Sequence, residues 1–161
     1  MEKSKTATIL ITGATGNIGT ELTKLLSVRK MPFRAMVRNR KDAKALAELE
    51  GAEIVGGDFD DSESVAKALQ GMERAFLLTN SSERAETQQT DFVEAAQRAG
   101  IKHLVKQSQW AADVNSPVRF LRYHAAVESK ISYPKNASLT KDTGCARLRA
   151  KRSLERATQK K

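Results

Sequence analysis

Three glycines near the N-terminus have the spacing best suited to chemistry in this chain. Gly13, Gly16 and Gly19 follow a short apolar run and precede an amphipathic segment. This order predicts a strand, a tight turn and a helix start, which together form a cradle for a pyrophosphate. The first glycine permits the turn, the second permits close approach of a phosphate, and the third permits helix–strand packing. Backbone N–H groups near Asn17 and Ile18 are then expected to face the anion.

Cations follow the second apolar run, at the position that distinguishes NAD from NADP. A chain that prefers NAD carries an acidic residue about 20 positions after the glycines, whereas an arginine there accepts the 2′-phosphate of NADP. No Asp or Glu occurs from residue 23 to residue 41, while Arg38, Arg40 and Lys41 lie there. Because a guanidinium pairs with a phosphate through two hydrogen bonds, the pattern favours NADP (NADPH), with NAD as the other cofactor considered. The alternative interpretation is a solvated basic start to the second helix.

Alternating apolar periods predict five strand–helix units that hold these residues in place. We expect strands at 7–12, 33–38, 53–55, 75–78 and 103–105, and helices near 17–29, 41–49, 83–99 and 118–131. A further helix, capped by Asp61 or Ser62, is expected to carry Val65, Ala68 and Leu69. Strands separated by helices of this length imply parallel pairing with right-handed crossovers. The sequence therefore predicts an α/β fold: a doubly wound parallel Rossmann-type sheet of five strands in the order 3-2-1-4-5, with flanking helices.

Polar or special residues follow every predicted strand. In an open parallel sheet the ligand binds beyond the carboxyl ends of the strands, where the strand order reverses. The residues expected at that rim are the glycine loop, Arg38–Lys41, Asp58–Phe59, Thr79–Asn80 and Ser108–Trp110. One rim of this kind is what a bound dinucleotide requires.

Charge is distributed unevenly along the 161 residues. Residues 1–128 contain 18 Lys/Arg and 17 Asp/Glu, whereas residues 129–161 contain 10 and 2, so the net charge of +9 belongs almost entirely to the last segment. A nucleic-acid partner is therefore not favoured for the folded part. No apolar run approaches the ~20 residues that span a membrane, so no membrane partner is expected. Cys145 is the only cysteine, which precludes an internal disulfide and fits the cytoplasm.

Five blocks together resemble one family. With the glycine loop, Val37–Asn39, Gly57–Phe59, Leu77–Thr79 and Ser116–His124 in place, residues 6–131 are similar to the NmrA-like family of atypical short-chain dehydrogenase/reductase relatives. Its members include NAD(P)H-dependent quinone and azo-dye reductases and redox-sensing regulators. The resemblance implies a cofactor-binding set of Gly13, Thr15, Gly16, Asn17, Ile18 and Gly19 at the pyrophosphate, Arg38 at the adenosine phosphate, Asp58 and Phe59 beside the adenine, and Thr79 near the nicotinamide ribose.

The catalytic positions depart from the wider superfamily, which uses a Tyr and a Lys four residues later. This chain has His124 and Glu128 at that spacing, with Tyr123 one position away. His124 is a candidate acid because an imidazole titrates near neutrality, and a structural role is the alternative. Ser108 is a candidate to hydrogen-bond a substrate carbonyl, or else satisfies the backbone. No metal site is expected.

A change of composition after Ile131 marks a second departure. Family members continue with a further strand and a substrate domain to about twice this length, whereas residues 132–161 are basic and poor in large aliphatics. We therefore expect a NAD(P)-binding domain at 1–131 and a basic, disordered tail at 132–161, from a truncation, a frameshift or an unusual splice. Without a sixth strand, residues 102–107 would form a bare sheet edge.

Two functions remain open from the sequence. The first is an NADPH-dependent oxidoreductase that passes hydride to a small electrophile such as a quinone or an azo dye, or a truncated, inactive form of one. The alternative is a non-catalytic NAD(P)-binding redox sensor that acts through a protein partner.

Overall fold

A computed structural model describes residues 6–131 and 140–141 of the chain. Its centre is a single sheet in the order β3-β2-β1-β4-β5-β6, in which every neighbouring pair is parallel. The strands are β1 (Ile9–Ile11), β2 (Phe33–Val37), β3 (Ala52–Gly56), β4 (Arg74–Leu77), β5 (His103–Ser108) and β6 (Thr140–Lys141). The predicted order of the first five strands is confirmed.

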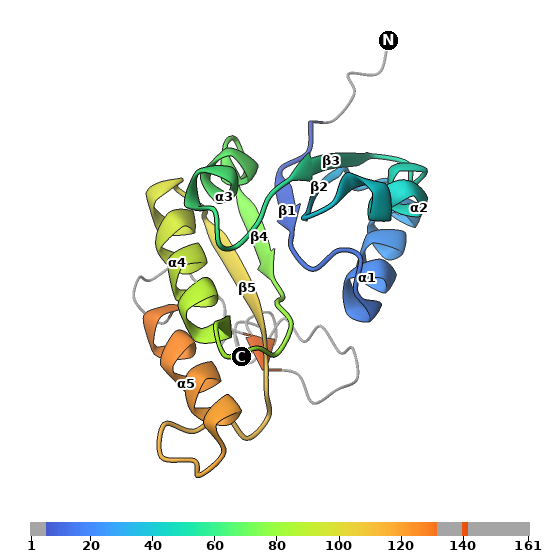
Figure 1. The fold of residues 1–161 in the computed structure, drawn as a ribbon. Coiled ribbons are helices and arrows are strands. Elements are labelled where there is room, and N and C mark those ends of the chain that lie inside the picture. Colours follow the sequence, from blue (N-terminus) through green and yellow to red (C-terminus); the bar gives the residue numbers. More distant parts are fainter. Residues whose placement is uncertain (1–5, 132–139, 142–161) are drawn as a thin grey trace, which may run out of the picture.

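Helices cover both faces of the sheet (Figure 1). They are α1 (Asn17–Val28), the 3₁₀ helix η1 (Arg40–Ala43), α2 (Lys44–Ala47), α3 (Ser62–Leu69), α4 (Ala85–Arg98) and α5 (Arg119–Ile131). The α1 and α2 side and the α3, α4 and α5 side each have their own buried cluster. Adjacent residues of β1 belong to different clusters, because successive side chains of a strand point to opposite faces of the sheet. Leu10 lies in the cluster with Val65, Phe92 and Val127. Ile11 lies in the cluster with Leu26 and Phe33.

The strand order reverses at β1, which lies between β2 and β4. Leu10 and Ile11 pair with Arg34 and Ala35 on one side, and Ile11 pairs with Phe76 on the other. Because successive connections leave β1 in opposite directions, a crevice is expected at its carboxyl end. This is where the glycine loop lies.

β6 corrects one expectation about the sheet edge. Thr140 and Lys141 pair with Gln107 and Ser108 of β5. The prediction of a bare edge is therefore wrong at Gln107, since the open N–H and C=O groups of an edge strand accept any extended backbone, whatever its composition. The other residues of the predicted basic tail lie outside the described part of the chain.

The helix predicted near 41–49 is shorter and begins differently. The Asn39 side chain accepts a hydrogen bond from the Lys41 N–H at 3.0 Å, which starts the 3₁₀ helix η1, and α2 follows directly from it. Short 3₁₀ segments are common at such starts because a side-chain cap favours a tight first turn. Other boundaries differ from the prediction by a few residues. Among the described residues, no helix is both long enough and apolar enough to cross a membrane.

Candidate functional site

The glycine loop keeps its shape through two glycines and leaves space above the third. Gly13 has a φ of +62°, and a Cβ there would lie 2.8 Å from the Leu78 carbonyl oxygen. A Cβ at Gly19 would lie 2.1 Å from the Gly13 carbonyl oxygen, so only glycine allows α1 to approach the loop. A Cβ at Gly16 would meet only the Gly13 carbonyl oxygen, at 3.4 Å. Gly13 and Gly19 are therefore required by the fold, whereas Gly16 leaves room for a ligand.

Thr12 fixes this loop to the neighbouring strand. Its side chain is fully buried, and its hydroxyl oxygen accepts a hydrogen bond from the Leu78 N–H at 2.9 Å. The same oxygen lies 3.1 Å from the carbonyl oxygens of Phe76 and Leu78. The carboxyl ends of β1 and β4 are thus held together at the level of the loop. From the sequence, Thr12 was assigned only to the predicted strand at 7–12 and not to a role in holding the loop.

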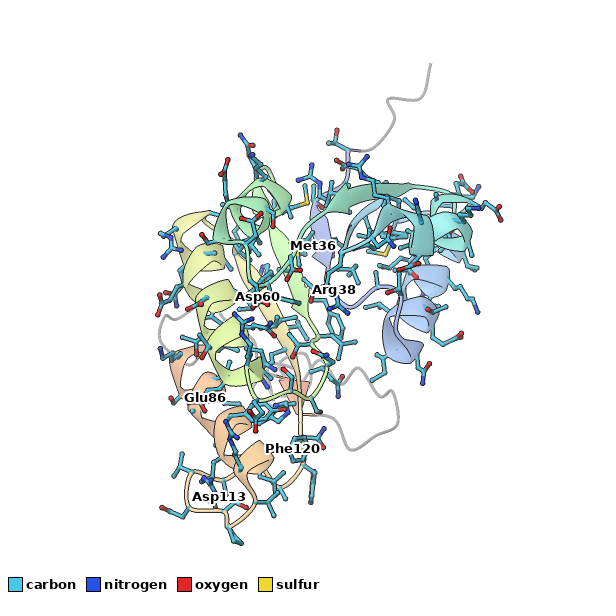
Figure 2. All side chains as sticks on the ribbon, in the orientation of Figure 1. Met36, Arg38, Asp60, Glu86, Asp113 and Phe120 are labelled. Atoms are coloured by element: carbon cyan, nitrogen blue, oxygen red, sulfur yellow. The ribbon has the colours of Figure 1, made fainter. Side chains whose placement is uncertain are left out.

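A cleft of about 490 Å³ opens over the loop. It is lined by nine of the ten residues predicted to bind the cofactor: Gly13, Thr15, Gly16, Asn17, Ile18, Arg38, Asp58, Phe59 and Thr79. The tenth, Gly19, lies in the contact between the loop and α1. Arg38 and Asp60, which both line the cleft, appear near the centre of the molecule in Figure 2. The structure therefore brings residues from the ends of four strands to one cavity.

The start of α1 fits an anion in this cleft. Its N-cap, Gly16, offers no side-chain acceptor, and its first turn contains no acidic residue. The N–H groups of that turn and the positive end of the helix dipole are therefore directed to whatever occupies the space above Gly16. With Arg38 at the end of β2 and a volume within the usual range for small-molecule sites, the residues present fit a dinucleotide.

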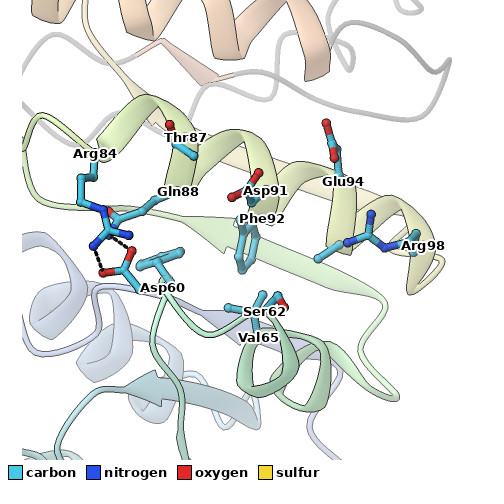
Figure 3. Close-up of a pocket in the computed structure, with 12 residues that line it drawn as sticks. Asp60, Ser62, Val65, Arg84, Thr87, Gln88, Asp91, Phe92, Glu94 and Arg98 are labelled. Atoms are coloured by element: carbon cyan, nitrogen blue, oxygen red, sulfur yellow. Dashed lines mark hydrogen bonds and ion pairs between the residues drawn. The ribbon is translucent and has the colours of Figure 1, made fainter.

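A second cavity, of about 320 Å³, lies between α3 and α4 and shares Phe59, Asp60 and Gln88 with the cleft (Figure 3). Asp60 Oδ2 lies 2.8 Å from Arg84 Nη1, and Asp60 Oδ1 accepts a hydrogen bond from Gln88 Nε2 at 2.8 Å. This bridge ties the loop after β3 to the start of α4. None of its three residues was singled out from the sequence.

Four polar side chains are buried together between β5 and α5. This Lys106 cluster consists of Lys106 and Ser108 from β5, which have no exposed surface, and of His124 and Glu128 from α5, which are 6% and 7% exposed. Lys106 Nζ lies 2.5 Å from His124 Nδ1 and 3.4 Å from Ser108 Oγ. The Ser108 hydroxyl donates to the Glu128 carboxylate. The two predicted catalytic residues, Ser108 and His124, thus belong to one cluster.

Burial shifts the titration of the two bases in this cluster. Burial lowers the pKa of Lys106 to about 8, and the nearby Glu128 carboxylate opposes that shift. Burial and, to a smaller extent, the Lys106 ammonium together lower the pKa of His124 to about 4. At neutral pH the lysine is therefore charged and the imidazole neutral. Lys106 was not predicted to belong to the site, although its position two residues before Ser108 places both residues on one face of a strand.

None of the four residues of the Lys106 cluster lines the cleft. Leu77 of β4 pairs with Lys106, so Thr79 and Ser108, each two residues further on, follow at the same level. Thr79 lines the cleft, and its hydroxyl accepts a hydrogen bond from Gln89 Nε2 at 2.7 Å. Gln89 is buried, and its Oε1 has no hydrogen-bond partner among the residues that the structure describes. Within residues 6–131 and 140–141, no group of three His, Cys, Asp or Glu side chains has the arrangement of a metal site.

A parallel, doubly wound sheet with a glycine loop and a cleft at its switch point defines an α/β protein of the Rossmann-like class. The NmrA-like family model matches residues 5–131, and the chain belongs to this family.

Relatives of this chain include named reductases. The NAD(P)H azoreductase of Xenophilus azovorans is 33% identical over 115 residues, which cover 71% of this chain and 40% of that protein. Quinone oxidoreductase 2 of Escherichia coli is 34% identical over 128 residues, which cover 77% and 44%. The crystal structure of the Citrobacter sp. triphenylmethane reductase complexed with NADP(H) matches with a TM-score of 0.71 at 29% identity, covering 83% and 49%. The chain thus spans about two fifths of the length of the curated relatives it matches.

Proposed function

We propose that this chain binds NADPH in the cleft and reduces a small electrophile such as a quinone or an azo dye. The observation that carries the proposal is the cleft over the glycine loop, with Arg38 at its rim and the open position above Gly16. Its membership of the NmrA-like family and the names of its relatives support the same class of activity. The cytoplasm is the proposed location.

Each group of cleft residues has a proposed role. The loop residues from Gly13 to Gly19, with the start of α1, bind the pyrophosphate, and Arg38 binds the 2′-phosphate. Asp58 and Phe59 flank the adenine, and Thr79 contacts the nicotinamide ribose. When bound, the cofactor supplies a hydride to the acceptor.

His124 is the proposed proton donor for the reduced acceptor. Its ring contacts Lys106, which is in register with Leu77 of β4, two residues before Thr79 of the cleft. The Ser108 hydroxyl already donates to Glu128, so we assign Ser108 to holding the Lys106 cluster together rather than to contacting the acceptor.

Two measurements on the purified chain test the proposal. The first is equilibrium titration with NADPH and NADH, and the second is NADPH oxidation with a panel of quinones and azo dyes. Tight NADPH binding with turnover supports a reductase. Binding without turnover would replace it with the alternative of a nucleotide sensor, and no binding of either cofactor would overturn both. The Gly16→Val variant is the matched control, since its side chain would occupy the space above the loop.

A further inference from the structure

Lys106 is a buried cation with no role in the proposed cofactor site. It has no exposed surface, and it lies on the face of β5 that packs against α5. Burying an ammonium group is unfavourable by several kcal/mol unless it is paired and hydrogen-bonded. A methionine or leucine in its place would avoid this loss of hydration. Because stability alone does not favour a lysine here, we expect its contacts to serve the function of the protein.

All three N–H donors of Lys106 have acceptors. The ammonium contacts His124 Nδ1 at 2.5 Å, the Gln107 carbonyl oxygen at 3.2 Å and Ser108 Oγ at 3.4 Å. An ammonium group only donates, so His124 Nδ1 is an acceptor, and the proton of the neutral ring is on Nε2. The lysine thus selects one of the two neutral tautomers of His124.

The charges around Lys106 explain why it stays protonated. From α5 it faces the Glu128 carboxylate, through Ser108, and the neutral His124 ring, which stacks on Tyr123. β6 brings the backbone of Lys141 into register with Ser108. Glu128 favours the charged form of the lysine, whereas burial opposes it. A base in this balance can give up a proton near neutral pH and take it back.

We propose that Lys106 is a positioning residue that keeps His124 as a neutral donor with its proton on Nε2 and that resupplies this proton through Nδ1. This inference rests on the proposed reductase function of the cleft.

The proton movements balance without a further reactant. When the acceptor oxygen takes a proton, the Nε2–H bond of His124 breaks and an O–H bond forms. At the same time an N–H bond of Lys106 breaks and an Nδ1–H bond forms, which leaves a neutral amine beside Glu128. The cluster resets when Nε2 takes a proton from water and the Nδ1 proton returns to the Lys106 amine, which restores the ammonium and the starting tautomer. The cluster moves protons only, because the electron pair comes from the nicotinamide reductant.

The first test measures the tautomer directly and needs no turnover. The chain contains two histidines, and the exposed His103 is an internal reference in ¹⁵N NMR spectra of the imidazole rings. We expect His124 to show a protonated Nε2, an unprotonated Nδ1 and no titration between about pH 5 and pH 8, the range in which an ordinary histidine changes charge. In Lys106→Met we expect a mixture of tautomers and a higher pKa of His124, because the Lys106 ammonium lowers that pKa in the parent chain. A protonated Nδ1 in the parent chain, or an unchanged ring in the variant, overturns the proposal.

Two further variants keep the result interpretable. Lys102→Met removes an exposed lysine that pairs with Glu73 at 2.9 Å, just before β5, and should leave the His124 signals unchanged. If Lys106→Met alone does not fold, the double variant Lys106→Met with Glu128→Gln removes both buried charges together, which avoids an uncompensated carboxylate. A retained Nε2–H preference in the folded double variant contradicts the proposal.

Turnover then separates this proposal from the reductase proposal. In Lys106→Met we expect NADPH affinity to stay the same while kcat falls about 100-fold, the usual contribution of a positioned acid. If the parent chain shows no turnover, the reductase proposal fails, but the NMR result still decides whether Lys106 controls His124. If the parent chain turns over and Lys106→Met does so equally fast, the proton resupply is wrong.

Discussion

We propose that cofactor choice depends on Arg38, the side chain that directly follows β2. Arg38 lines the cleft, whereas the nearby cations Arg40 and Lys41 do not. We predict that NADPH binds more tightly than NADH and that Arg38→Glu reverses the order. The NADPH affinity should fall about 10- to 100-fold, because a hydrogen bond to a charged group contributes about 1.5–3 kcal/mol. Competitive titration of the two cofactors measures this change.

Lys41→Glu is the matched control for Arg38→Glu, because it makes the same charge change in the same segment but outside the cleft. The control should weaken NADPH binding only slightly and should keep the preference over NADH. Equal affinities for the two cofactors in the parent chain would contradict the assignment of Arg38.

Nine of the residues that line the cleft could be predicted from the sequence because they follow strands, and strand ends meet at one edge of a parallel sheet. Thr12 and Lys106 could not, because what they do depends on burial. A polar or charged residue in a strand has the same appearance in sequence whether it faces water or a helix. Only the packing of α5 on β5 encloses Lys106 with His124 and Glu128.

At the scale of elements, different glycines of the loop between β1 and α1 serve cofactor binding and the stability of the fold. We predict that Gly16→Val leaves the fold intact but abolishes binding of both cofactors, because its side chain would lie in the space above the loop. Gly19→Ala should instead destabilise the fold by about 1–3 kcal/mol, the usual result of overpacking, because α1 must move away from the Gly13 carbonyl. Urea unfolding and NADPH titration of both variants distinguish the two effects.

The outcome that would contradict this division is also specific. If Gly16→Val still binds NADPH, the pyrophosphate does not bind in the space above Gly16. If Gly19→Ala is as stable as the parent chain, the contact between α1 and the loop is not what holds the turn.

Elements differed in how well the sequence predicted them. The order of β1 to β5 followed from apolar periods and helix lengths, which are encoded locally. β6 did not, because a two-residue strand is defined by backbone pairing with Gln107 and Ser108 and needs no particular side chain. The division of the second helix into η1 and α2 depends on the Asn39 side chain, a local contact that periodicity does not report.

At the scale of the whole molecule, the residues that line the cleft lie between residues 13 and 88, far along the chain from the basic tail at 132–161. We predict that deleting residues 142–161, or residues 133–161, leaves the NADPH-induced shift in melting temperature unchanged. That shift corresponds to about 2.7 kcal/mol at a hundredfold excess of ligand over its dissociation constant. Only the longer deletion removes β6 from β5, so it alone should lower the melting temperature without ligand. Differential scanning fluorimetry of the three chains tests this, and a lost shift would place the tail in the site.

The Lys106 cluster also sets how stability varies with pH. The pKa of His124 falls from 6.5 to about 4 on folding, so the unfolded chain binds more protons in that range, and stability should rise as the pH increases through it. The pKa of Lys106 falls from 10.5 to about 8, so stability should rise again across that second range. Each rise amounts to at most about 3 kcal/mol, at 1.36 kcal/mol per pKa unit. Urea unfolding at a series of pH values measures both rises.

Two variants assign these rises to their residues. His124→Gln should remove the rise at acid pH and keep the one at alkaline pH, because the amide does not titrate. Lys106→Met should remove the rise in stability at alkaline pH. It should also narrow the pH range over which stability rises at acid pH, since without the ammonium the pKa of His124 returns toward its ordinary value. A parent chain whose stability is flat across both ranges would mean that neither base is buried as the structure describes.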